Sequence, residues 1–154
     1  MEKILISACL VGDKTRYDGK GHYNPLIEKL LERFELVPFC PEVEGGLSVP
    51  RERSEIKNEK VLTESGRDVS FQFRNGAEKA YNICLYLGIR YAILVDRSPS
   101  CGSTQVYDGS FKGRLTNGEG VTTRYLKSKG IKIIPDTKIQ DFLNHLEEKE
   151  ENNK

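Results

Sequence analysis

The chain has 154 residues, 37% of them hydrophobic, which is enough to bury one core and too little for two independent domains. Its 24 basic and 23 acidic side chains leave a formal net charge of +1, so bulk charge favours neither a polyanion nor a membrane surface as partner. The apolar start ends before Asp13 and is too short for a signal peptide or a spanning helix. We therefore expect a cytoplasmic protein, whose four cysteines are thiols or metal ligands rather than disulfides.

The first half of the chain predicts two strands and one helix. The aliphatic run Lys3–Ala8 lacks alternation, as in a parallel strand that is covered on both faces. Asn24-Pro25 predicts the start of a helix whose apolar face extends to Phe34. Glu35–Phe39 predicts a second strand. No periodicity is sustained from residue 41 to residue 60, and a long loop is expected there.

The second half predicts two strands, three helices and a hairpin. Apolar steps of three and four indicate a helix over 69–88, with Cys84 on its buried stripe and Gly88 at its end. A strand over 91–95 follows, and then a loop and a small polar hairpin marked by two Xaa-Gly turns. A helix over 121–128, a strand over 131–134 and a last helix with a capping box at Thr137 complete the pattern.

The alternation of strands and helices predicts an α/β fold with one domain over residues 1–146. We expect a mainly parallel, Rossmann-like four-stranded sheet with helices on both faces and a small β-hairpin. Residues 147–154 form a charged tail that is expected to fray.

Three cysteines stand where such a sheet binds ligands, beyond the carboxyl ends of its strands. Cys9 follows the first predicted strand, Cys40 follows the second, and Cys101 lies in the loop after the strand over 91–95. We expect these thiols to share one site and to hold an oxygen-sensitive metal centre. The alternative is that each is a small buried hydrophobic residue, which is our interpretation of Cys84.

Polar groups near these thiols suit acid–base chemistry and anion binding. Glu42 stands two residues after Cys40, and Ser98 and Ser100 precede Cys101. Arg16, Arg51 and Arg53 would fix a carbonyl, an anion or a phosphate. No G-x-G-x-x-G, G-x-x-x-x-G-K-[ST], H-E-x-x-H or C-x-x-C motif points to another cofactor.

Seven motifs between about Ile4 and Thr122 make the chain resemble the thiouracil desulfidase family. The most specific of them is the run that contains Cys101. The motifs are Ser7-Ala8-Cys9-Leu10, Arg16-Tyr17-Asp18-Gly19, Cys40-Pro41-Glu42, Gly45-Gly46-Leu47, Pro50-Arg51, Arg97-Ser98-Pro99-Ser100-Cys101-Gly102 and Tyr107-Asp108-Gly109.

The resemblance implies a [4Fe–4S] cluster held by Cys9, Cys40 and Cys101, with the fourth iron open to the substrate. It also implies removal of sulfur from thiouracil-type bases by attack of water, without net electron transfer. The catalytic residues that carry over are Glu42 and Ser98. Substrate binding is expected from four further residues, which are Ser100, Arg16, Arg51 and Arg97.

The chain departs from the family at Thr15, where many relatives have a cysteine just before the Arg-Tyr-Asp-Gly run. We retain Cys9 as a ligand, because without it only two of the three loop thiols that the cluster needs would remain. The chain also ends before the extra C-terminal domain of longer relatives that act on RNA. We therefore expect a small thiolated pyrimidine, as free base or nucleoside, and not RNA.

Two other functions agree with the same residues. In the first, the three thiols and His22 form a closed four-ligand zinc site, which would bind or sense metal without catalysis. In the second, Cys101 is a nucleophile that carries sulfur as a persulfide. The sequence leaves the oligomeric state open.

Overall fold

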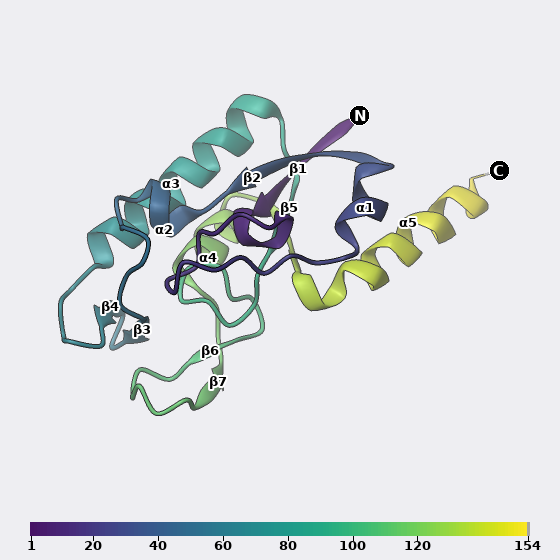
Figure 1. The fold of residues 1–154 in the computed structure, drawn as a ribbon. Helices are drawn as coiled ribbons and strands as arrows, with labels where there is room; N and C mark the ends of the chain where they lie inside the picture. Colours follow the sequence, from purple (N-terminus) through teal and green to yellow (C-terminus); the bar gives the residue numbers. More distant parts are fainter. Residues whose placement is uncertain (154) are drawn as a thin grey trace.

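A computed structural model describes residues 1–153 and shows the α/β architecture that the sequence predicts (Figure 1). Four parallel strands form one sheet in the order β2 (Phe34–Phe39), β1 (Glu2–Ser7), β5 (Tyr91–Leu94), β8 (Lys132–Pro135). Two antiparallel hairpins accompany it. They are β3 (Ser54–Lys57) with β4 (Lys60–Thr63), and β6 (Gln105–Tyr107) with β7 (Leu115–Asn117).

Helices cover both faces of the sheet. On one face α1 (Ile27–Leu31) and α5 (Ile139–Asn152) pack in the same cluster as Ile4 and Ile6 of β1. On the other face α3 (Ser70–Leu87) and α4 (Val121–Ser128) pack in a cluster with Leu5. Successive residues of β1 thus enter opposite cores, which explains its unbroken aliphatic run. No helix within residues 1–153 is long and apolar enough to cross a membrane.

Short helical turns follow three of the four sheet strands. The 3₁₀ turn η1 (Ala8–Val11) follows β1, α2 (Pro41–Glu44) follows β2, and the 3₁₀ turn η2 (Asp136–Lys138) follows β8. Proline fits the first position of α2 because that residue needs no hydrogen-bond donor. Each turn reverses the chain at the carboxyl edge of the sheet.

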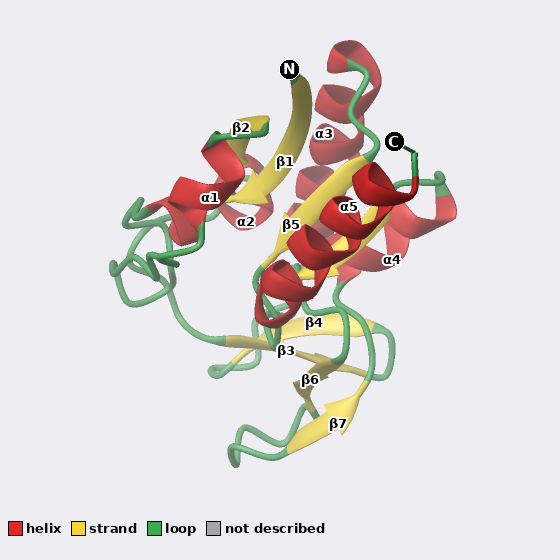
Figure 2. Cartoon of the chain, turned by 90° about the vertical axis from the view of Figure 1, so that its right-hand side faces the viewer, coloured by secondary structure: helices red, strands yellow, loops and turns green. Residues whose placement is uncertain are grey.

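The two hairpins lie together beyond that edge of the sheet (Figure 2). Glu55 of β3 accepts hydrogen bonds from the backbone of the β6–β7 connection, so the hairpins support each other. A small apolar cluster of Val61, Val69 and Phe73 anchors the first hairpin to the start of α3. The hairpins thereby form a wall that faces the carboxyl ends of the strands.

Several sequence-based boundaries are wrong. The helix predicted through Phe34 ends at Leu31, because Phe34 begins β2 and stacks on Phe142 at 5.8 Å. The loop predicted over 41–60 contains α2, β3 and the start of β4. Its strands have four residues each, which is too few for a clear alternation.

The C-terminal helix also differs from the prediction. No side-chain cap forms at its start, where the turn η2 takes the place of the predicted capping box at Thr137. The helix continues through the charged segment to Asn152, where the sequence predicted fraying. Lys154, the end of that predicted tail, lies outside the described residues.

Two glycines set the position of the turn that carries Cys40. A Cβ at Gly76 of α3 would lie 1.9 Å from the Pro41 carbonyl oxygen, and one at Gly45 would lie 2.0 Å from the Gln72 carbonyl oxygen. The backbones of α2 and α3 therefore meet without intervening side chains. This contact seats Cys40 and Glu42 beside the sheet edge.

Gly76→Ala should destabilise the protein, although alanine is the better helix former. The added methyl group forces α2 away from α3, and we expect the free energy of unfolding to fall by about 1–3 kcal/mol in urea titrations. The control is Glu78→Ala at an exposed position of the same helix, with an expected change within about 0.5 kcal/mol. Equal stability of Gly76→Ala and the parent would contradict this close approach.

Candidate functional site

A cavity of about 620 Å³ opens at the carboxyl edge of the sheet, between the strand ends and the two hairpins. We call it the edge cavity. It gathers most of the residues that the sequence singles out, although they come from distant segments. Those in its lining are Cys9, Cys40, Cys101, Glu42, Ser98, Arg16, Arg51, Arg53, Arg97 and His22.

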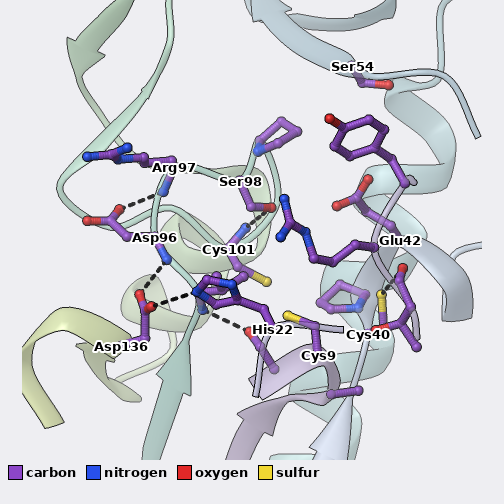
Figure 3. Close-up of a pocket in the computed structure, with 18 of the residues that line it drawn as sticks. Cys9, His22, Cys40, Glu42, Ser54, Asp96, Arg97, Ser98, Cys101 and Asp136 are labelled. Atoms are coloured by element: carbon purple, nitrogen blue, oxygen red, sulfur yellow. Dashed lines mark hydrogen bonds and ion pairs between the residues drawn. The ribbon is translucent and has the colours of Figure 1, made fainter. Parts of the chain in front are cut away.

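The three predicted thiols lie on the same part of the edge cavity (Figure 3). Cys9 belongs to η1 and is 6% exposed, Cys40 caps α2, and Cys101, 4% exposed, lies in the turn after β5. All four cysteines of the chain are free thiols. Cys84 packs in the core between α3 and the sheet, as predicted. The structure thus brings Cys9, Cys40 and Cys101 to one cavity and keeps Cys84 apart from them.

The environment of the thiols opposes their ionisation. Burial raises the pKa of Cys9 to about 11, with a further rise from Cys40 that Arg16 partly offsets. Burial also raises the pKa of Cys40 and, far more strongly, that of Cys101. Because thiolates are the form that binds metals, these side chains need a nearby positive centre before they can all be charged.

Glu42 and Ser98 face each other in the same cavity. The Ser98 oxygen accepts the backbone N–H groups of Ser100 at 3.0 Å and Cys101 at 3.1 Å. Its hydroxyl hydrogen remains for the Glu42 carboxylate, which also accepts a bond from Arg51 Nε at 3.3 Å. Burial raises the pKa of Glu42, and the contacts with Arg51 and Ser98 oppose that rise. A carboxylate is thus held close to the thiols.

His22 lies in the edge cavity but is directed toward an acidic residue. Its Nε2 is 4.0 Å from Asp136 Oδ2, and its backbone N–H donates to the Cys9 carbonyl at 2.8 Å. Its side chain is 52% exposed. This orientation does not favour a zinc site made from His22 and the three thiols.

The family model of 2-thiouracil desulfurase matches residues 4–138. The chain belongs to this family. It is 37% identical over 150 residues to the uncharacterized protein YbbK of Bacillus subtilis (strain 168), covering 91% of this chain and 99% of YbbK. A solved structure described as the [4Fe–4S]-dependent thiouracil desulfidase TudS superimposes with a TM-score of 0.89 at 42% identity. The match covers 96% of this chain and 99% of that one.

In this member of the 2-thiouracil desulfurase family, Arg51 lines the edge cavity and is also bonded to other parts of the protein. Its guanidinium donates to Glu42, to the Ser48 carbonyl at 3.1 Å and to the Thr15 carbonyl at 2.9 Å. The side chain is only 8% exposed. Three of the five guanidinium N–H groups are thus engaged within the protein, so Arg51 positions Glu42 and the loop that contains Thr15. The substrate contact expected of Arg51 stays a prediction.

Ser100, which was expected to bind substrate, does not line the edge cavity. Its side chain is fully buried outside the edge cavity, with its oxygen 2.7 Å from the Thr122 hydroxyl oxygen. The Ser100 carbonyl accepts the N–H groups of Thr122 and Thr123. Ser100 therefore fastens the Cys101 turn to the start of α4.

Arg16 and Arg97 occupy different parts of the edge cavity. Arg16 lies near Cys9, where its charge lowers the pKa of that thiol. Arg97 is exposed at the rim, with φ of 70°, and Figure 3 shows its side chain directed away from the thiols. Arg16 is the better placed of the two to meet a substrate beside the thiols.

Asp96 is a site residue that the sequence analysis missed. Its Oδ1 accepts the backbone N–H groups of Arg97, Ser103 and Thr104 at 2.9, 3.0 and 3.1 Å, and its Oδ2 accepts the Thr104 hydroxyl. Its own N–H donates to Asp136 Oδ1 at 2.9 Å. Asp96 thus shapes the loop that carries Cys101. The position of Asp96 shortly after a predicted strand could have identified it, because the rule that ligands bind at the carboxyl ends of strands also identified the cysteines.

Asp96→Asn should lower stability at neutral pH more than in acid. Burial by itself raises the pKa of Asp96, but hydrogen bonds from Thr104, Arg97 and Ser103 outweigh it and lower that pKa. A depressed pKa means that the carboxylate stabilises the fold above about pH 4, and that this contribution is lost as the pH falls through the folded-state pKa. We expect Asp96→Asn to reduce the free energy of unfolding by about 1–2 kcal/mol at pH 7.

Denaturant titrations of metal-free protein at several pH values measure this difference. The gap between parent and Asp96→Asn should shrink as the pH falls below about 4 and through the depressed folded-state pKa of Asp96, because the protonated carboxyl is uncharged like the amide. Exposed Asp13→Asn is the control and should show no such trend. A gap of equal size at pH 7 and in acid would refute the role of the Asp96 charge.

Proposed function

We propose that the protein removes sulfur from thiolated pyrimidines, such as thiouracil or its nucleoside, at a [4Fe–4S] cluster held by Cys9, Cys40 and Cys101. The observation that carries the proposal is the placement of three free thiols beside the Glu42–Ser98 pair in one cavity. The likeness to a protein described as a [4Fe–4S]-dependent thiouracil desulfidase supports the choice of cofactor and substrate.

The donor set fits such a cluster. Thiolates are the usual protein ligands of iron–sulfur clusters, and the positive irons offset the burial that raises the pKa of these thiols. Within residues 1–153, no three His, Cys, Asp or Glu side chains group as ligands of a single ion. In a cluster each thiolate binds a different iron, so the ligands are spread more widely than around one ion.

The bound cluster would supply a sulfur-preferring Lewis acid with an open coordination position. The protein supplies the proton transfers. Glu42 accepts a proton from the attacking water and returns it as the thiocarbonyl becomes a carbonyl. One water enters and one hydrogen sulfide leaves, so no electrons are gained or lost.

Ser98 and Arg51 hold Glu42 in place for this role. Ser98 is itself fixed by two backbone N–H groups, and Arg51 is fixed by two carbonyls, so the carboxylate is oriented before substrate binds. Arg16 is the candidate to bind the remaining carbonyl oxygen of the base, and Arg97 is a candidate for more distant parts of the substrate.

The persulfide alternative receives less support from the same geometry. Cys101 is 4% exposed, and burial raises its pKa strongly, so it is a protonated thiol in the metal-free chain. A persulfide-forming cysteine needs thiolate character and access.

A small substrate and a cytoplasmic location are part of the desulfidase proposal.

Protein reconstituted without oxygen should release sulfide from 2-thiouracil or 4-thiouracil and form uracil, measured by sulfide assay and chromatography. Glu42→Gln should lower the rate by about 10²–10⁴-fold, because the amide cannot accept the proton. The matched control is Glu44→Gln, an exposed position of the same short helix, which should retain the parent rate. If Glu42→Gln kept its iron and matched the parent, Glu42 would not be the base.

A further inference from the structure

Glu55 is a cavity residue that the proposed reaction leaves without a role. Glu55 is buried, with 4% of its surface exposed. It forms no ion pair within that range. A buried carboxylate without a cationic partner is unfavourable for folding, so this position suggests a function.

One oxygen of Glu55 is used by the protein, and the other is free. Oε1 accepts the backbone N–H groups of Gly109 at 2.9 Å and Phe111 at 3.1 Å. These two bonds fix the plane of the carboxylate and leave Oε2 without a hydrogen bond from residues 1–153. Glu55 lines the edge cavity, so Oε2 is a pre-oriented acceptor with no partner in the protein.

Glu55 enters the lining of the edge cavity from β3, next to Ser54. Figure 3 shows Ser54, its neighbour in β3, across the cavity from Cys9 and Cys40, with Glu42 and Ser98 between them. A substrate whose sulfur points to the thiols would extend its ring toward β3.

We propose that Glu55 Oε2 accepts a hydrogen bond from the substrate, either from a ring N–H of the thiolated pyrimidine or from a ribose hydroxyl of its nucleoside. This inference rests on the proposed function and adds a specificity residue to it. A fixed acceptor favours ligands that present a donor and rejects analogues that lack it, because such an analogue would displace water from Oε2 without replacing its hydrogen bond.

Glu55→Gln separates this role from support of the hairpins. The glutamine oxygen still accepts from Gly109 and Phe111, so the fold should persist, but an amide N–H₂ replaces the free oxygen. The experiment titrates cluster-loaded protein without oxygen by calorimetry. The probes are the products uracil and uridine, which do not turn over, together with 1-methyluracil and 3-methyluracil.

We expect Glu55→Gln to weaken binding of uracil or uridine about tenfold to a hundredfold, with unchanged iron content and thermal unfolding. If a ring N–H is the donor, one N-methyl analogue will bind the parent weakly and Glu55→Gln equally weakly. If a ribose hydroxyl is the donor, uridine binding will fall and uracil binding will not. Glu35→Gln, on the distant β2, should match the parent.

Two outcomes overturn the role of Glu55 alone. One is that Glu55→Gln binds uracil and uridine as the parent does. The other is that it loses the same factor for every probe, which would indicate a displaced hairpin. A parent that neither desulfurates thiouracil nor binds its products would instead refute the proposed function, and the Glu55 proposal with it.

Discussion

The parallel pairing of β1 with β2 on one side and β5 on the other is the constraint on which the site depends. Ser7, the last residue of β1, is aligned with Phe39, so η1 and α2 leave the sheet next to each other. Ser7 is buried, and its oxygen accepts the Val95 N–H at 2.9 Å while its hydroxyl reaches the Cys101 thiol. A slip of β1 by one residue against β2 and β5 would turn its side chains to the opposite faces of the sheet and move Cys9 away from Cys40 and Cys101.

The polar groups that line the edge cavity lower the stability of the empty protein, and a bound group would offset that cost. Three thiols and the carboxyl groups of Glu42 and Glu55 are largely withdrawn from water there, and Arg51 pairs with Glu42. Desolvated groups of this kind are costly to fold. The cofactor would supply a cationic centre for the thiolates, and the substrate would supply a hydrogen-bond donor for Glu55. Each would therefore offset part of the free-energy cost of burying these groups.

Much of this arrangement could be predicted from the sequence, since strands covered on both faces give unbroken aliphatic runs and ligands gather at the carboxyl edge. That reasoning placed Cys9, Cys40 and Cys101 together and Cys84 in the core. The reasoning failed where a local sequence pattern does not show which way a side chain points in the fold. Ser100 stands in the most specific motif yet points into the core, and Arg51 donates to the Thr15 carbonyl, which only the fold brings near. The β3 strand, which carries Glu55, is too short to show its alternation.

The iron and acid-labile sulfide content of protein purified without oxygen tests the central claim most directly. We predict about four irons and four sulfides per chain. Both should be lost when Cys9, Cys40 or Cys101 is replaced by alanine and kept in Cys84→Ala. A protein without labile sulfide, or one whose cluster survives the loss of any of these three thiols, would contradict the account.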